Sequence, residues 1–382
     1  MYKVSLSHRE RVRIALNHQE PDRVPMDLCA STCNIVDPLY FKVKDMLGIK
    51  GDIKPYRSGK TCNYYDERIL QALDTDFRHI WLSSAKSSKK VKYPDGSFID
   101  EWGAHMKKIG NFVEPVEPTI KEPSMDALKK HNWPDTEDTS RVDGLKERAS
   151  YLYHNTDYAI SAKFVSSGGF LEHGGWLRGF ENWLMDLTLN EEFANAFCDK
   201  ILEIKLKLYE MMLHEVGDYI DMVEIAEDFG TQGGLLISPK MFRKYMKPRY
   251  KKLIDKIKEL APNAKVFFHT CGSVRPIIQD LIDVGVDVLN PLQPLAVGMN
   301  PGEINNLYGD KLSFHGAIDI QVALPGTIDD VREEVKARIK QLAKGGGYIL
   351  APTNHVQDDT PPMNLIALYK FAHEYGKYPI NL

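Results

Sequence analysis

Residues 265–272 read Lys-Val-Phe-Phe-His-Thr-Cys-Gly, a short apolar run that ends in polar and reactive side chains. A run of this length between two amphipathic helical patterns is typical of a buried parallel strand. His269 and Cys271 lie at its carboxyl end, which is where parallel α/β enzymes place their reactive groups. The stretch therefore predicts both the class of fold and the centre of the active site.

The same pattern repeats on both sides of this strand. Short apolar runs alternate with amphipathic helical patterns such as residues 191–215 and 328–343. Alternation of this kind buries a parallel sheet on both faces and favours a (β/α)8 TIM barrel. We expect its strands within residues 23–29, 77–82, 158–164, 219–225, 265–269, 286–290, 311–315 and 348–351.

One segment departs from this alternation. Between Val91 and Met106, the turn residues Pro94-Asp95-Gly96 separate two short extended segments, which predicts an inserted β-hairpin. An α/β barrel can exceed the usual size of a domain, so the length of the chain does not require a split. We therefore expect residues 1–382 to form a single domain.

The overall composition excludes several classes of protein. The formal net charge is −4 and the isoelectric point is about 6.3, so the chain has no overall positive field to attract nucleic acid. Its 5 cysteines are few and irregularly spaced, which is typical of reduced thiols. Residues 1–10 have no apolar signal core, and no stretch approaches the roughly 18 apolar residues of a membrane span. We therefore expect a cytoplasmic protein with no membrane or nucleic-acid partner.

Carboxylates gather at the end of another predicted strand, in the segment 221–228. Glu224, Glu227 and Asp228 lie in or directly after an apolar run, where a buried charge is costly unless it binds something. We identify Asp228 and Glu224 as candidates for catalysis, substrate binding or metal binding. The alternative is that Glu227 and Asp228 are solvated residues that cap the next helix.

His269 and Cys271 place an imidazole and a thiol close together, and both groups are good ligands for Zn²⁺. Two ligands do not complete a zinc site, so a capping turn with a buried histidine is the alternative interpretation. His355 comes after the last predicted strand and supplies a further metal-ligand candidate at the same end of the barrel. Three polar residues after neighbouring strands are candidates for cofactor binding: Asn290, Gln293 and His315.

Five motifs are spread over nearly the whole chain. They are residues 20–25 (Glu-Pro-Asp-Arg-Val-Pro), 176–181 (Trp-Leu-Arg-Gly-Phe-Glu), 268–272 (Phe-His-Thr-Cys-Gly), 285–291 (Gly-Val-Asp-Val-Leu-Asn-Pro) and 345–352 (Gly-Gly-Gly-Tyr-Ile-Leu-Ala-Pro). Together they resemble the uroporphyrinogen decarboxylase superfamily. The resemblance implies a (β/α)8 barrel, the fold that the alternation of strands and helices predicts independently. It also implies one of two activities, since the superfamily contains tetrapyrrole decarboxylases and zinc methyltransferases that act with a corrinoid protein.

The segment after the first predicted strand separates these two activities. Decarboxylases of the superfamily carry Arg-Gln-Ala-Gly-Arg there, which grips the carboxylates of the porphyrinogen, whereas residues 27–32 of this chain read Asp-Leu-Cys-Ala-Ser-Thr. Without those counter-charges the porphyrinogen loses its main binding partners, so the resemblance favours the methyltransferases. In the branch that acts on thiols a later cysteine joins the His-x-Cys pair, but residues 353–356 here read Thr-Asn-His-Val. His355 is the nearest substitute ligand.

The resemblance implies a zinc ion held by His269 and Cys271, together with His355 or a carboxylate such as Asp228. The zinc would polarise the methyl-bearing atom of a small methoxylated or methylated donor, and the cobalamin of a separate corrinoid protein, in its cob(I)alamin form, would accept the methyl group. Two alternatives remain: a decarboxylase of uroporphyrinogen or another carboxylic acid, and a catalytically silent barrel that binds a corrinoid partner. A homodimer is compatible with each of these functions.

Overall fold

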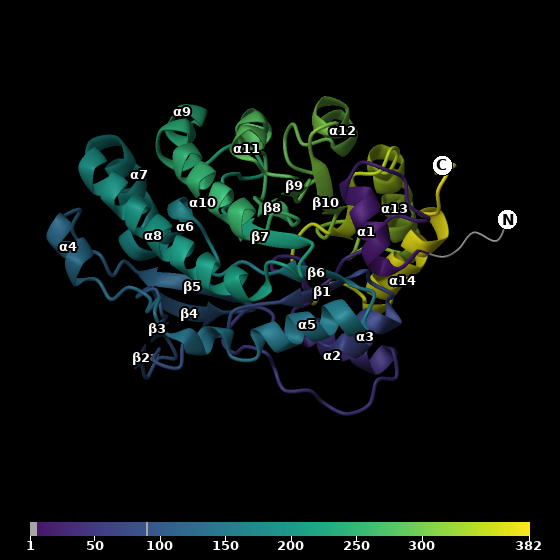
Figure 1. Ribbon diagram of the computed structural model, residues 1–382, viewed down its shortest axis with the longest axis horizontal. Helices are drawn as coiled ribbons and strands as arrows, with labels where there is room; N and C mark the ends of the chain where they lie inside the picture. Colours follow the sequence, from purple (N-terminus) through teal and green to yellow (C-terminus); the bar gives the residue numbers. More distant parts are fainter. Residues whose placement is uncertain (1–5, 89–90) are drawn as a thin grey trace.

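The computed structural model describes residues 6–88 and 91–382, and its centre is a curled sheet of parallel strands (Figure 1). The 7 strands have the order β1-β6-β7-β8-β9-β10-β11. Their bounds are β1 (Phe77–Ile80), β6 (Ala159–Ala162), β7 (Met222–Ala226), β8 (Lys265–His269), β9 (Val288–Asn290), β10 (Ser313–Ile318) and β11 (Tyr348–Pro352). Apart from Lys265, every residue in these strands is buried, as expected of a parallel sheet that is covered on both faces.

The packing inside the sheet shows that its two edges approach each other. One buried cluster takes a single residue from each of β1, β6, β7, β8, β9 and β11 and two residues from helix α1 (His8–Leu16): Phe77, Ala159, Met222, Phe267, Val288, Ile349, Val12 and Leu16. Residues of the first and last strands share one cluster only if the sheet bends round an axis. Helix α1 packs into this interior, and a capping box between Ser7 and Glu10 fixes its start.

The first of the predicted strands is wrong, because a short irregular segment takes its place. The Asp27 N–H donates to the Leu350 carbonyl of β11 at 3.0 Å, which ties the segment to the last strand. The Asp76 N–H, directly before β1, donates to the Met26 carbonyl at 2.8 Å. The segment forms two isolated bridges, Arg23 with Lys377 and Met26 with Leu350, and Pro25 between them has no N–H with which to extend either pairing. The segment therefore joins β11 to β1 without being a strand.

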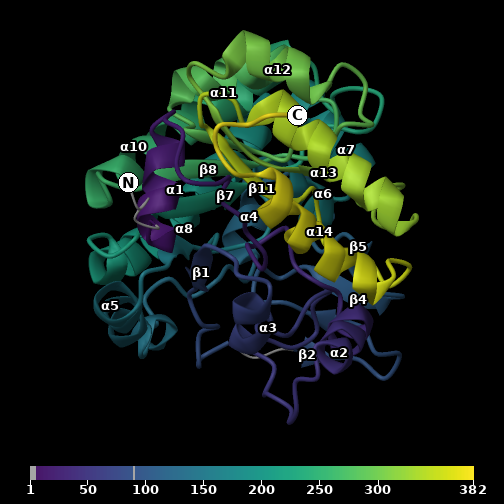
Figure 2. The ribbon, with the colours of Figure 1, turned by 90° about the vertical axis from the view of Figure 1, so that its right-hand side faces the viewer.

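Helices connect the strands and cover the outside of the sheet (Figures 1 and 2). The longest, α8 (Glu191–Val216), packs against α10 (Lys247–Leu260), and α13 (Ile328–Leu342) packs against α14 (Pro362–Tyr375). The other α-helices are α2 (Asp37–Met46), α3 (Glu67–Ala72), α4 (Met125–Lys130), α5 (Leu145–Asn155), α6 (Phe170–Arg178), α7 (Phe180–Leu189), α9 (Pro239–Met241), α11 (Ile278–Val284) and α12 (Pro301–Tyr308), with short 3-10 or π turns at Thr139–Val142, Phe242–Met246 and Arg275–Ile277. Within the described ranges, no helix is long and apolar enough to cross a membrane.

A second, antiparallel sheet lies between β1 and α4 in the chain and at the left of Figure 1. Its strands, in the order β2-β3-β4-β5, are β2 (Val91–Lys92), β3 (Phe98–Ile99), β4 (His105–Ile109) and β5 (Phe112–Glu117). β2 and β3 flank the turn at residues 94–96, with Val91 opposite Ile99. Where the sequence predicts a hairpin, the structure has a 4-stranded sheet, because residues 105–117 add two more strands.

A buried carboxylate ties α1 to the amino end of the sheet. Asp76 lies directly before β1, and its side chain is 0% exposed. Its two oxygens accept hydrogen bonds from the Arg11 and Arg23 guanidinium groups, at 2.7 Å each, and from the Met26 N–H at 2.7 Å. The His8 imidazole lies 2.8 Å from the same carboxylate. This network is at the opposite end of the strands from the predicted site, where polar groups usually stabilise the fold rather than take part in chemistry.

Candidate metal centre

The pairing of β7 with β8 brings two reactive segments together at the carboxyl end of the sheet. In this register Ala226 lies opposite His269. Two residues further along each segment, Asp228 therefore comes next to Cys271, whose N–H donates to Asp228 Oδ1 at 2.9 Å. The turn after Cys271 is tight: Gly272 has a φ of +78°, and a Cβ atom there would collide with the backbone of the loop after β7.

His269, Cys271 and Asp228 present three metal-ligating atoms to one point. His269 Nε2 lies 3.3 Å from Cys271 Sγ and 3.4 Å from Asp228 Oδ1, and the three ligand atoms all lie within 4.8 Å of one another. Imidazole, thiolate and carboxylate are ligands that Zn²⁺ takes in proteins. The Asp228 side chain is 39% exposed and Cys271 is half-buried, so one side of the group faces solvent. Three protein ligands with an open side are typical of a catalytic zinc site rather than a structural one.

The charges of this group favour a bound cation. Burial lowers the pKa of the His269 imidazole, but the adjacent Cys271 and Asp228 groups raise it more, so its pKa lies well above the ordinary value. Burial raises the pKa of the Cys271 thiol. The pKa of Asp228 is lowered despite burial, because His269 and the Cys271 N–H stabilise the carboxylate. A divalent cation bound here would take the place of the proton that these groups otherwise share.

Asn290, at the end of β9, determines which nitrogen of His269 is available to a metal. Asn290 Nδ2 donates to the His315 carbonyl oxygen at 3.2 Å, which fixes the side-chain amide because a carbonyl only accepts. The other amide atom, Oδ1, therefore faces His269 Nδ1 at 2.5 Å, and this nitrogen carries a hydrogen. His269 Nε2 is left as the ligand atom, directed at Cys271 and Asp228. Amide or carboxylate support of this kind is usual for zinc-bound histidines.

Replacing Asn290 with alanine should weaken zinc binding by about 10- to 100-fold, because the His269 ring loses the acceptor that fixes its tautomer. Competition between the purified protein and a chelator measures this change. Thr32→Val is the matched control: Thr32 Oγ1 donates to the same Asn290 oxygen at 3.3 Å, but its loss leaves the His269 bond in place. Unchanged zinc affinity in Asn290→Ala, or an equal loss in Thr32→Val, contradicts this role of the amide.

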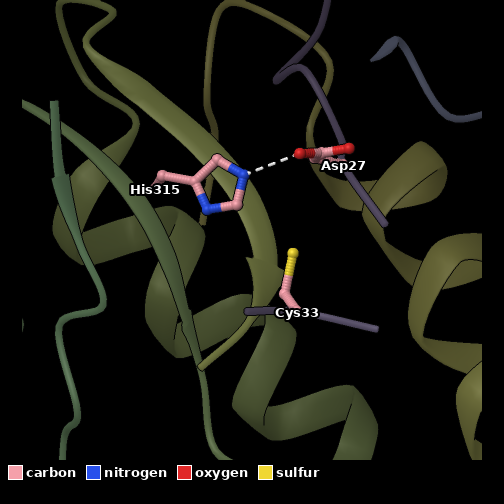
Figure 3. A group of neighbouring side chains, drawn as sticks. All are labelled: Asp27, Cys33 and His315. Atoms are coloured by element: carbon pink, nitrogen blue, oxygen red, sulfur yellow. Dashed lines mark hydrogen bonds and ion pairs between the residues drawn. The ribbon is translucent and has the colours of Figure 1, made fainter. Parts of the chain in front are cut away.

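A second group of polar side chains lies behind Asn290 and is fully buried. Figure 3 shows Asp27, Cys33 and His315, in which His315 Nε2 donates to Asp27 Oδ2 at 2.9 Å and the Cys33 sulfur is directed toward the pair. His79 Nε2 lies 3.3 Å from the same Asp27 oxygen. Asn290 Nδ2 connects this inner group to the metal-ligand group, since it lies 2.9 Å from His315 Nδ1. Although burial opposes ionisation, the two histidines hold the pKa of Asp27 well below its ordinary range.

The inner group also contains metal-ligating side chains, and the ligand atoms of Asp27, Cys33 and His315 lie within 4.8 Å of one another. All three residues are buried, so the group offers no open position to a substrate. The Asp27 carboxylate is already engaged with two imidazoles. The group around His269 is therefore the better candidate for a catalytic metal. The inner group contacts it through Asn290, which bonds both His315 and His269.

The structure places His355 near the centre but outside the three-ligand group. His355 Nδ1 accepts from the Asn34 backbone N–H at 3.1 Å, and burial lowers the pKa of this imidazole to about 3. The preceding residue, Asn354, donates from Nδ2 to Cys271 Sγ at 3.3 Å. Among the described residues, the third ligand atom beside His269 and Cys271 thus comes from Asp228, and the metal-ligand role of His355 stays a prediction.

The other predicted site residues surround the centre at different depths. Glu224 is fully buried in β7, and its Oε1 accepts from the Ser161 hydroxyl at 2.8 Å. Gln293 Oε1 accepts from the Gly272 N–H at 2.7 Å and so holds the turn after Cys271. The catalytic role of Glu224 stays a prediction. The same holds for the cofactor contacts predicted for Asn290, Gln293 and His315.

Glu227 is not a solvated residue, because its side chain is buried and caps a helix. Its two oxygens accept from the backbone N–H groups of residues 169–172, at distances from 2.5 to 3.2 Å, and from the Tyr250 hydroxyl at 3.0 Å. These N–H groups form the first turn of α6. The alternative that Glu227 caps the next helix is therefore wrong, since α6 precedes β7 in the chain.

Replacing Glu227 with glutamine should lower the free energy of unfolding by about 3 kcal/mol, because one amide N–H₂ then faces N–H groups that need an acceptor. Urea denaturation followed by circular dichroism measures the loss. Tyr250→Phe is the control, since it removes only one donor to the same carboxylate and should cost about 1 kcal/mol. Equal stability of Glu227→Gln and the parent protein contradicts the capping role.

Glu172 is a site residue that the sequence does not identify. Its Oε2 accepts from the Asp228 N–H at 3.2 Å, and burial together with the Asp228 and Glu227 carboxylates raises its pKa to about 8. It lies in the first turn of α6, where an acidic residue is ordinary, so no local signal marks it. His79 and Lys163 do carry a local signal of a site residue. Each is a polar residue within or directly after a buried strand, where apolar residues are usual.

Comparison with known proteins identifies the family of the chain. The family model described as uroporphyrinogen decarboxylase (URO-D) matches residues 111–375. The methylcobamide:CoM methyltransferase MtaA of Methanosarcina barkeri is 28% identical over 156 residues, which are 41% of this chain and 42% of that protein. The methylcobamide:CoM methyltransferase MtbA of Methanosarcina mazei is 23% identical over 194 residues, 50% of this chain and 52% of that protein. A uroporphyrinogen decarboxylase of Prochlorococcus marinus is 24% identical over 196 residues, 49% of this chain and 52% of that protein.

The matches to these curated relatives span about half of their length or less. A solved methyltransferase from Methanosarcina mazei covers 97% of this chain and 99% of its own, with a TM-score of 0.65 and 16% identity, and so shares the fold. The family model covers more than half of the chain. The protein therefore belongs to the uroporphyrinogen decarboxylase (URO-D) family, within which it resembles the methylcobamide:CoM methyltransferases.

Proposed function

We propose that the protein is a zinc-dependent methyltransferase that moves a methyl group from a small methoxylated or methylated donor to the cob(I)alamin of a separate corrinoid protein. The observation that carries this proposal is the group formed by His269, Cys271 and Asp228, which gathers three zinc-ligand types around an open side. We also propose that residues 1–382 form one (β/α)8 barrel domain, in which the segment at Met26 takes the eighth position.

The residues of the centre have separate roles in this proposal. His269 Nε2, Cys271 Sγ and Asp228 Oδ1 would hold the zinc, which would supply a Lewis acid to polarise the methyl-bearing atom of the donor. Asn290 keeps the His269 ring in the ligating tautomer. Glu172, whose pKa is raised to about 8, keeps a proton next to Asp228 near neutral pH, and this proton can pass to the leaving atom of the donor.

The decarboxylase alternative lacks support at the segment that binds porphyrinogen carboxylates in that branch. Residues 27–32 contain no arginine or lysine. The one ionisable side chain in the segment, apart from the buried thiol of Cys29, is the Asp27 carboxylate, which is engaged with His315 and His79. A polyanionic tetrapyrrole would therefore meet a buried negative charge where it needs counter-charges.

The test combines metal analysis with a direct assay. Protein purified without chelators should contain one zinc per chain, and with a suitable donor it should convert free cob(I)alamin to methylcobalamin, which the visible spectrum reports. The proposal fails if the protein holds no metal and does not bind added zinc in the micromolar range. Formation of coproporphyrinogen from uroporphyrinogen would instead establish the decarboxylase.

A further inference from the structure

Lys163 is a buried cation without an anionic partner. It comes directly after β6, its exposure is 3%, and its Nζ has no hydrogen-bond partner among residues 6–88 and 91–382. Lys205 is equally buried at 3%, but its ammonium donates to the Ser166 hydroxyl at 3.0 Å and to the Gly168 carbonyl at 2.6 Å. The fold therefore provides hydrogen-bond acceptors for the buried Lys205 ammonium but, within the described ranges, none for that of Lys163.

Three aromatic rings surround the Lys163 ammonium. Its Nζ lies 5.0 Å from the ring centre of Tyr56, 5.3 Å from that of Tyr65 and 5.5 Å from that of Trp81. Contacts of this length stabilise a cation, but an aromatic ring is a poor acceptor for the three N–H groups of an ammonium. The rings therefore compensate only part of the cost of burying an unpaired charge. All three rings are half-buried, so the group is open to solvent on one side.

The position of Lys163 connects it to the metal centre. Carboxyl ends of parallel strands meet at one end of a sheet, and β6 is separated from β8 by one strand, so the backbones of these two strands are roughly 10 Å apart. The charges of both residues, and that of Arg57, act on the His355 imidazole and lower its pKa together with burial. A single small molecule can therefore contact the ammonium and the metal ligands at once.

We propose that Lys163 binds a carboxylate of the methyl donor, so that the donor is an organic anion with its methyl group at the opposite end. The assignment of this anion as the methyl donor rests on the proposed function, whereas the anion site itself does not. A donor with a single carbon atom is too short to reach both the ammonium and the metal centre. The three aromatic rings beside the ammonium favour a flat, apolar body next to the carboxylate.

Two probes that differ only in charge test the site. Calorimetric titration of the purified protein with 4-methoxybenzoate should give clear binding, and titration with the neutral 4-methoxybenzamide should give binding at least about tenfold weaker, because only the carboxylate pairs with an ammonium. In Lys163→Met the affinity for 4-methoxybenzoate should fall by about tenfold or more, with that for the amide unchanged. Lys163→Arg keeps the charge and should retain most of the preference for the anion.

Several outcomes overturn the proposal. These are failure of the parent protein to bind 4-methoxybenzoate at millimolar concentration, equal affinity of the parent for both probes, and equal affinity for the anion in Lys163→Met and the parent. Circular dichroism and thermal unfolding of each variant verify that it is folded, and Lys163→Arg separates loss of charge from loss of structure. Because binding is measured without corrinoid or turnover, absence of methyl transfer leaves the result intact. Conversely, methyl transfer that is unaffected in Lys163→Met would refute this site and leave the proposed function standing.

Discussion

Replacing Cys271 with alanine is expected to lower the rate of methyl transfer by at least about a thousandfold and to remove most of the bound zinc. The thiol is one of three ligand atoms within 4.8 Å of one another, and two remaining ligands do not hold zinc firmly. Loss of a Lewis acid removes several kcal/mol of transition-state stabilisation, and each 1.4 kcal/mol or so is a factor of ten in rate. Metal analysis and the conversion of cob(I)alamin to methylcobalamin measure the two effects.

Cys198→Ala is the control for this experiment. Cys198 is fully buried in α8, so its replacement leaves a small cavity that should cost about 1 kcal/mol of stability. The zinc content and the rate should stay near those of the parent protein. A Cys271→Ala variant that retains full zinc and activity, or a Cys198→Ala variant that loses both while folded, is incompatible with the proposed centre.

Replacing Asp76 with alanine is expected to lower the free energy of unfolding by about 3–5 kcal/mol. The change leaves the Arg11 and Arg23 guanidinium groups and the Met26 N–H without their shared acceptor in a buried place. Urea denaturation at pH 7 measures the loss. Asp74→Ala is the control, because the Asp74 side chain is 51% exposed and its 3.2 Å bond to Arg23 should contribute less than about 1 kcal/mol. Similar losses in the two variants would contradict the special role of Asp76.

The pH dependence of this stabilisation has a definite sign. Burial raises the pKa of Asp76, but His8, Arg23 and Arg11 lower it more, so the folded-state pKa lies below the ordinary value. An acid with a lowered pKa stabilises the fold fully above its unfolded pKa, near 4, and loses that contribution as pH falls through the folded value. The difference in stability between the parent and Asp76→Ala should therefore narrow as pH falls below about 4.

The parallel sheet and the placement of the His-x-Cys pair at a strand end could be predicted from the sequence because both depend on neighbours along the chain. Apolar runs identified seven of the strands that the structure contains, and the run before His269 placed the His-x-Cys pair at a carboxyl end. The strand predicted at residues 23–29 is wrong, because Pro25 cannot donate and the segment forms only isolated bridges, at Arg23 and at Met26. An apolar composition alone does not show whether the backbone can complete a ladder.

Which side chain lies beside His269 and Cys271 depended on the tertiary structure. The sequence offered both His355 and Asp228, and the register that sets Ala226 opposite His269 brings Asp228 to Cys271. Strand register is fixed by packing of side chains from the whole sheet, so no local pattern contains it. The same is true of Glu172, which reaches the site from a helix 56 residues before Asp228.

Sequence alone determined which chemical groups stand at the ends of the strands, since the order of residues along the chain fixes which side chains come after each apolar run. Only the tertiary structure decided how these groups act on one another. It fixes the His269 tautomer through an amide at the end of another strand, and it makes Glu227 the buried cap of α6 rather than a solvated cap of the next helix. Among the described residues, it also leaves the Lys163 ammonium without a hydrogen-bond partner beside three aromatic rings. Each of these outcomes depends on distances between atoms from distant segments, and hydrogen bonds and charge interactions change steeply with such distances.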